Sequence, residues 1–245
     1  MPSWLARGRP WLALAAVVLI AGMLLPPFGT YAREYALAEA LQYVVFAVAA
    51  PALLVLGSPW RPAGVSRRPG PTRAMAVLVA FIALAIAWRV PVVLNTLARD
   101  RGLAVAEMVT LVTAGSAVWL ELVQPPPLLP RLSRPQRAAM AAAPMWTIWV
   151  LAYVMGMSRV AWSAAYSHPA GRGLSTAADQ QFAAGLMWAV PALCFLPVIY
   201  GVIIPWLRDS GDPDEEFREG GAGDTLDSGL STLPRPPRGW RPPPA

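Results

Sequence analysis

Six apolar stretches constrain this chain more than any other feature of its sequence. They cover Trp11–Leu25, Ala36–Gly57, Ala74–Leu94, Leu103–Val123, Ala138–Val160 and Phe182–Leu207. A helix rises about 1.5 Å per residue, so about 20 apolar residues cross the roughly 30 Å of bilayer hydrocarbon. The stretches are continuous and do not alternate between apolar and polar residues, which argues against a β-barrel. The sequence therefore predicts an all-α fold, a polytopic transmembrane helical bundle with about six spans.

The composition excludes a soluble helical protein. The chain is 56% hydrophobic and only 14% charged, far from the balance of ordinary soluble domains. A soluble core would also need amphipathic helices to cover it, and the six stretches leave none. The lipid bilayer is the first predicted partner.

The positive charges predict the topology. All 20 positive residues are arginines, and they cluster at Arg7/Arg9, at Arg61/Arg67/Arg68/Arg73 and at Arg131/Arg134/Arg137. The intervening connections carry fewer. By the positive-inside rule both termini are cytoplasmic, and the loops around Arg33, Arg99 and His168 lie outside. Short clusters beside helix ends do not form a nucleic-acid surface, so no nucleic-acid partner is predicted.

The two ends of the chain carry separate expectations. Arg7 and Arg9 before the first apolar stretch also fit a cleaved secretory signal, but Pro26–Pro27 and the even number of spans favour a first helix that is retained. Residues 208–245 hold 8 acidic residues and 5 arginines among Gly and Pro, with too few leucines for a core. We expect a transmembrane domain over residues 1–207 and a disordered cytoplasmic tail over residues 208–245.

Polar side chains gather where the helices are predicted to reach the outer surface. They come from five different stretches: Glu39 and Gln42, Arg89, Glu107, Arg159, and Asp179, Gln180 and Gln181. Isolated ions at such a depth cost free energy, so mutual pairing is favoured. The group predicts a functional polar cluster lining an outer cavity. The alternative is that several members only reach the headgroup level, where arginine extends readily.

Several motifs together resemble one known family. They are Glu39–Trp60, the tetrapeptide Trp88-Arg89-Val90-Pro91, Ala106–Gly115, Tyr166, and Asp179–Trp188. In this order they are similar to the multi-spanning bacterial CtaG family of cytochrome c oxidase assembly factors. The most specific parts are Ala50–Gly57 and Asp179–Trp188. The resemblance covers about residues 30–207, and it implies a plasma-membrane protein in the maturation of haem–copper oxidases.

The chain departs from the family at four histidines. The family pattern His-x-x-Gln-His reads here as Glu39, Gln42 and Tyr43; its Trp-His-x-Pro contains Arg89; and its Glu-His reads Glu107-Met108. The resemblance implies copper as a candidate cofactor, but Glu and Arg do not make a good Cu(I) site. An arginine between acidic residues predicts instead an ion-pair network in place of a metal site.

Methionines and the histidine could also supply ligands for Cu(I), but their arrangement is only a weak signal of a metal site. These residues are Met108, Met155, Met157, Met187 and His168, and Met155 and Met157 point to different helix faces. Flexible packing is the usual role of methionine. No metal ligands are therefore predicted.

Three functions follow. The leading hypothesis is an assembly or maturation factor for a haem–copper cytochrome c oxidase, acting by contact with oxidase subunits. The alternative is a small-ion transporter or channel that uses the outer polar cavity, although the cytoplasmic half offers only Glu121 and Gln124. An enzyme is not predicted, because a lone Cys194 and a lone His168 supply no catalytic set.

Overall fold

A computed structural model describes residues 9–57, 71–123, 132–166 and 174–209 of the chain. Two compact units are distinguished, residues 1–202 and 203–245. Of the second unit only residues 203–209 are described, and they form the end of the helix Thr176–Asp209. The predicted tail from residue 210 onward lies outside the described residues, so its disorder stays a prediction.

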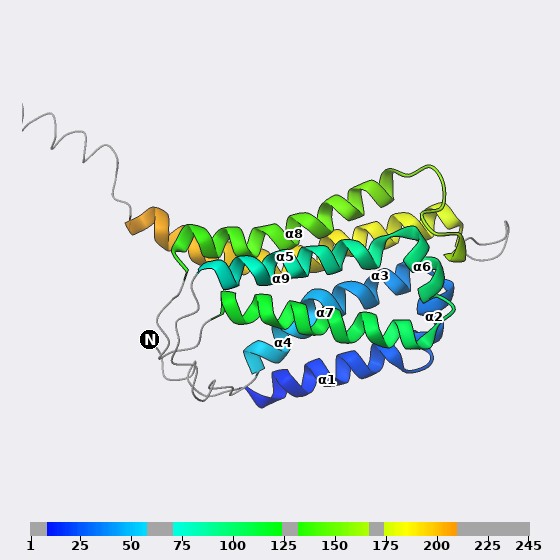
Figure 1. Ribbon diagram of the computed structural model, residues 1–245, viewed down its shortest axis with the longest axis horizontal. Helices are drawn as coiled ribbons and strands as arrows, with labels where there is room; N and C mark the ends of the chain where they lie inside the picture. The colour runs from blue at the N-terminus through cyan, green and yellow to red at the C-terminus, as the bar shows by residue number, and fades with distance from the viewer. Residues whose placement is uncertain (1–8, 58–70, 124–131, 167–173, 210–245) are drawn as a thin grey trace, which may run out of the picture. The chain divides into compact units, whose positions relative to one another are not determined.

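The described chain is all-helical, as predicted, with no strand in these residues (Figure 1). Its helices are α1 (Pro10–Leu24), α2 (Phe28–Glu34), α3 (Ala36–Val44), η2 (Val45–Ala49, a π-helix), α4 (Ala50–Gly57), α5 (Pro71–Arg89), α6 (Pro91–Leu97), α7 (Arg101–Leu122), α8 (Arg134–Met157), η3 (Ala164–Tyr166, a 3-10 turn) and α9 (Thr176–Asp209).

Five of the described helical segments are long and apolar enough to cross a membrane, and a sixth is added if α1 and α2 form one bent span. This agrees with the prediction of about six spans. The bend between α1 and α2 is 54°, and it falls at Pro26–Pro27, where a helix cannot continue unbroken. The orientation of the bundle in the membrane stays a prediction.

The third predicted stretch is broken where the sequence analysis continued it to Leu94. Helix α5 ends at Arg89, Val90 is extended with φ −64° and ψ 130°, and Pro91 begins α6. A residue before proline avoids the helical region, and proline suits the first position of a helix. The break leaves the backbone carbonyl of Arg89 at a helix end.

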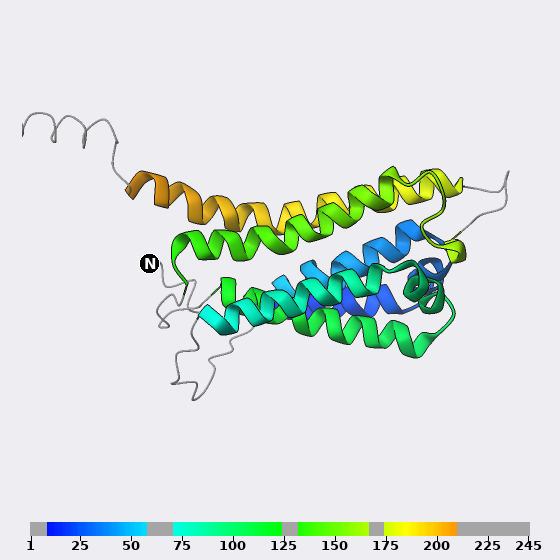
Figure 2. The ribbon, with the colours of Figure 1, turned by 45° about the horizontal axis from the view of Figure 1, so that its top comes forward.

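The second span is the centre of the bundle. About two thirds of it is buried (67%), compared with 17% of α9. Helix α1 packs on α4, α5 packs on α7 and α8, and α7 also packs on η2 and α4. Helices α8 and α9 run alongside each other (Figure 2).

A close helix approach fixes the position of α7. Pro51 has no N–H to give to the carbonyl of Ala47, and the π-helical turn lies directly before it. A Cβ on Gly115 would lie 2.3 Å from that carbonyl oxygen and 2.8 Å from Cγ of Pro51. Only glycine fits here, and its contact holds α7 directly against the central span.

Candidate functional site

Three buried charged side chains meet at one end of the bundle. Glu39 comes from the first turn of α3, Arg89 from the last turn of α5 and Glu107 from the second turn of α7, and each is 3% exposed or less. The Arg89 guanidinium donates from both terminal nitrogens to the two carboxylate oxygens of Glu39, one of them at 2.7 Å. Its Nη2 also lies 3.9 Å from Oε1 of Glu107. We call the end of the bundle that holds these residues the site end.

A tyrosine completes the packing around the guanidinium. The carbon Cζ of Arg89 lies 3.8 Å from the centre of the Tyr43 ring, a cation–π geometry that favours a desolvated cation. The Tyr43 hydroxyl donates to the carbonyl of Ala85 at 3.0 Å. Tyr43 was not among the residues predicted to form the cluster. Its spacing of four residues from Glu39 was the available signal, because such residues share a helix face.

Asp179 joins the beginning of α9 to the beginning of α3. Its carboxylate accepts the backbone N–H groups of Ala36 at 2.8 Å and Leu37 at 2.9 Å. These are the first two residues of α3, whose N–H groups have no partner within the helix. Asp179 is fully buried, so it caps α3 across 143 residues of sequence.

Gln180 joins the same turn of α9 to the end of α8. Its Nε2 donates to the carbonyls of Met155 at 2.7 Å and Ser158 at 3.2 Å. Its Oε1 accepts the backbone N–H of Trp162 at 2.7 Å. Carbonyls at the end of a helix need such partners, and here an amide from another helix supplies them.

Trp162 closes these contacts into a ring. Its indole N–H donates at 3.0 Å to the backbone carbonyl of Arg89, the residue at which α5 ends. A path of hydrogen bonds therefore runs from Glu39 through Arg89 to Trp162 and then to Gln180. Asp179, beside Gln180, returns the path to α3. Trp162 was not predicted from the sequence, because it lies in an irregular segment with no recognisable motif.

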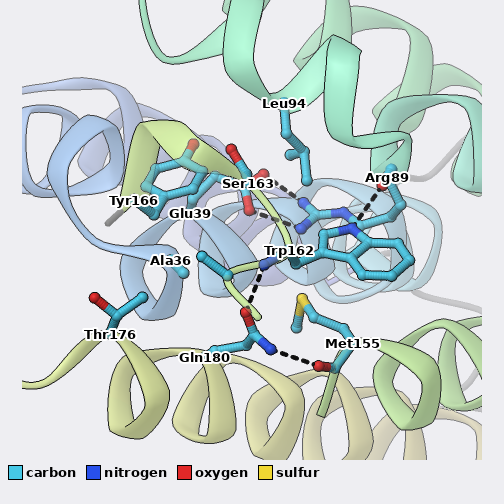
Figure 3. A pocket seen from close by; sticks show the side chains of 11 residues that line it. Ala36, Glu39, Arg89, Leu94, Met155, Trp162, Ser163, Tyr166, Thr176 and Gln180 are labelled. Carbon is cyan, nitrogen blue, oxygen red and sulfur yellow. Dashed lines mark hydrogen bonds and ion pairs between the residues drawn. The ribbon is translucent and has the colours of Figure 1, made fainter. Parts of the chain in front are cut away.

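A small cavity of about 20 Å³ lies inside this ring (Figure 3). Glu39, Arg89, Gln180 and eight other residues line it. Room of this size admits about one water-sized group. Among the described residues the buried hydroxyl of Tyr166 has no hydrogen-bond partner. Burial raises the pKa of that phenol, so the side chain stays neutral.

The remaining predicted site residues lie elsewhere. Gln42 is buried, and its amide donates to the carbonyl of Met23 at 2.9 Å, which joins α3 to the end of α1. Arg159 and Gln181 are exposed and lie outside the ring. Of the five predicted charges, three form the cluster, and Asp179 contacts the backbone of α3.

The donor set at the cluster does not fit copper. Two carboxylates face a guanidinium and a phenol ring there, whereas Cu(I) favours thiolate, thioether and imidazole ligands. No group of three or more His, Cys, Asp and Glu arranged for a metal is found in the described ranges. Met155 and Met187 are buried, whereas Met157 is 67% exposed. Met155 and Met157 therefore lie on different faces of α8, as predicted. His168 lies outside the described residues.

The chain was compared with known protein families, curated proteins and solved structures. The family model described as cytochrome c oxidase caa3 assembly factor (Caa3_CtaG) matches residues 2–209. No curated protein and no solved structure matches the chain.

Proposed function

The chain belongs to the cytochrome c oxidase caa3 assembly factor family, and from this premise we propose that it assembles a haem–copper oxidase by contact with an oxidase subunit, without holding copper at the site end. The proposal places the protein in the bacterial plasma membrane and gives it no catalytic step. The bidentate pairing of Arg89 with Glu39 is the observation that carries it.

This pairing supports a scaffold in preference to a metal carrier. Glu39, Tyr43 and Arg89 occupy three positions at which the family resemblance implies histidines, and in this chain Arg89 contacts both of the others. A guanidinium remains charged at any physiological pH and repels a metal cation. Both of its terminal nitrogens are already occupied by Glu39, so these residues hold α3 and α5 together.

The exposed faces of α8 and α9 support contact with a client within the membrane. The candidate spans of these helices are 39% and 17% buried, against 67% for the central span. Large side chains such as Val150, Tyr153 and Leu193 are more than half exposed there. Transmembrane helices associate through side-chain packing and interhelical hydrogen bonds. The faces of α8 and α9 leave surface for such contacts, as do those of α5 and α7, whose candidate spans are 22% and 28% buried.

The transporter alternative receives no support from the described residues. The cavity at the site end admits about one water-sized group. Toward the other end, Glu121 is paired with Arg73 at 3.4 Å. The central part of the second span between Val44 and Ala50 is apolar, and all of it except the half-buried Ala49 is buried. No polar path that joins the two ends appears in the described part of the chain.

A deletion strain tests the proposal. Reduced-minus-oxidised spectra of its membranes, recorded with and without added copper, report the assembled a-type haem. We expect loss of this signal, no rescue by copper, and rescue by the wild-type chain. Rescue by copper alone would assign the protein a copper role, and an unchanged spectrum would exclude an oxidase role.

Metal analysis of the purified protein separates the two modes of action. After mild purification we expect copper at far less than one equivalent per chain. A variant in which Glu39, Tyr43, Arg89 and Met108 are all replaced by histidine is the matched positive control, because three of these positions are in contact in the structure. One equivalent of copper on the wild-type chain, lost in Arg89→Ala, would contradict the proposal.

A further inference from the structure

The cluster at the site end contains one carboxyl group more than it has cations. Glu39, Arg89 and Glu107 are 3%, 2% and 2% exposed. If both carboxyls were ionised, the cluster would carry a net negative charge among apolar helices. An uncompensated ion in such surroundings is among the most expensive features that a membrane protein can contain.

The two carboxyl groups differ in their hydrogen bonds. Both oxygens of Glu39 accept from the guanidinium, which requires the ionised, acceptor-only form of that side chain. Oε1 of Glu107 is buried and has no hydrogen-bond partner among the described residues. Its separation of 3.9 Å from Nη2 of Arg89 is too long for a hydrogen bond. The geometry therefore favours negative charge on Glu39 and offers none of that support to Glu107.

No second cation approaches Glu107 from the described helices around it. The charges that act on it are those of Glu39 and Arg89. From α3 the cluster also meets Tyr43, whose hydroxyl is bonded to a backbone carbonyl. Segments η2, α4 and α6 contain no titratable residue, and Arg101 of α7 is exposed. Arg137 of α8 bonds the carbonyl of Leu122, at the opposite end of α7.

We propose that this cluster is a proton-binding site, in which the Glu107 carboxyl holds one proton while Glu39 remains ionised and paired with Arg89. The proton comes from water and forms an O–H bond on the Glu107 carboxylate, so the buried cluster becomes neutral. Neutrality then allows α3, α5 and α7 to pack within the hydrocarbon. The inference stands on the cluster alone and does not depend on the role in oxidase assembly.

Two isosteric substitutions in the full-length protein in lipid nanodiscs test the proposal. Gln reproduces a protonated carboxyl in shape and charge. Glu107→Gln should therefore leave the thermal midpoint of unfolding within about 2 °C of wild type, a shift as small as that of a typical substitution at the protein surface. Glu39→Gln removes the ionised partner of Arg89 and should lower the midpoint by on the order of 10 °C.

Infrared spectroscopy gives a direct readout that does not depend on stability. A protonated carboxyl band should be present in the wild-type protein at neutral pH and absent in Glu107→Gln. If Glu39→Gln does not accumulate, the band and the Glu107→Gln midpoint still decide. Absence of the band from the wild type, or a Glu107→Gln protein as unstable as expected for Glu39→Gln, would overturn the proposal.

Discussion

The two ends of the bundle hold charged residues and helix termini in contrasting ways. At the site end, Arg89 and Glu39 are both almost fully buried and paired through two hydrogen bonds. At the other end, which we call the Arg73 end, Arg73 is 51% exposed and lies 3.4 Å from the buried Glu121. Among the described residues, the arginine of the first pair is therefore buried with its glutamate, whereas the arginine of the second pair keeps half of its side chain at the surface.

The helix caps of the described residues differ between the two ends in degree, because Asp100 also caps α7 locally at the site end and Arg137 of α8 also contacts the Leu122 carbonyl at the end of α7. At the site end, side chains distant in sequence cap the ends of α3, α5 and α8. At the Arg73 end, α8 begins with a local capping box formed by Ser133 and Gln136. Long-range caps join separate helices, whereas a local cap supports only its own helix. The site end consequently joins more of the described helices to one another, and the Arg73 end should tolerate substitution better.

The largest expected contrast is between the two arginines. Arg89→Gln leaves the buried Glu39 carboxylate without its partner, and breaking such a pair costs about 3–5 kcal/mol. Arg73→Gln leaves the buried Glu121 without a partner that is itself 51% exposed, so water reaches the site and the cost should be smaller, about 1–3 kcal/mol. Thermal unfolding in nanodiscs and accumulation in membranes measure both variants. Equal losses for the two would contradict the contrast between the ends.

The caps should show the next largest difference. Asp179→Ala leaves two part-buried backbone N–H groups of α3 without an acceptor, at up to about 1–3 kcal/mol for each such group. Ser133→Ala, the control at the Arg73 end, should cost about 1 kcal/mol, as is usual for an exposed cap. Unfolding midpoints of the two variants compare them. A smaller loss for Asp179→Ala would mean that water replaces its contacts.

Two adjacent glutamines in the same turn of α9 provide a matched pair of variants at the site end. Gln180→Ala removes hydrogen bonds to α8 and to Trp162 and should cost about 1–3 kcal/mol. Gln181→Ala changes an exposed side chain and should stay within about 0.5 kcal/mol of wild type. Protease sensitivity of the segment around Trp162 gives a second measurement, and only the Gln180 variant should increase it.

The smallest expected effect concerns Tyr166. Its buried hydroxyl has no partner among the described residues, so Tyr166→Phe should be neutral or slightly stabilising. Because burial raises the pKa of this phenol in the folded state, the unfolded chain ionises first as the pH rises above about 10. The wild type should therefore lose stability in that range more steeply than the variant does, as measured by unfolding midpoints against pH.

The spans could be predicted because their signal is local. Continuous apolar runs of sufficient length indicate membrane helices without any knowledge of their neighbours, and the described helices agree with that prediction. The break at Val90 was missed, although Pro91 marked it, because the apolar run continues on both sides. Charged residues within such runs also indicated pairing, since isolated ions are costly there.

The partners of those residues were decided by the tertiary structure. Asp179, Gln180 and Gln181 are adjacent in sequence, yet the first caps α3, the second caps α8 and the third is exposed. Helix rotation and the path of the chain through Trp162 set these roles, and neither has a signature in the residue order. The sequence by itself determined that this chain forms apolar helices with a few charges that need partners. Only the packing of α3, α5 and α7 decided that Arg89 binds Glu39 and approaches Glu107, because contacts between distant segments depend on how the helices meet.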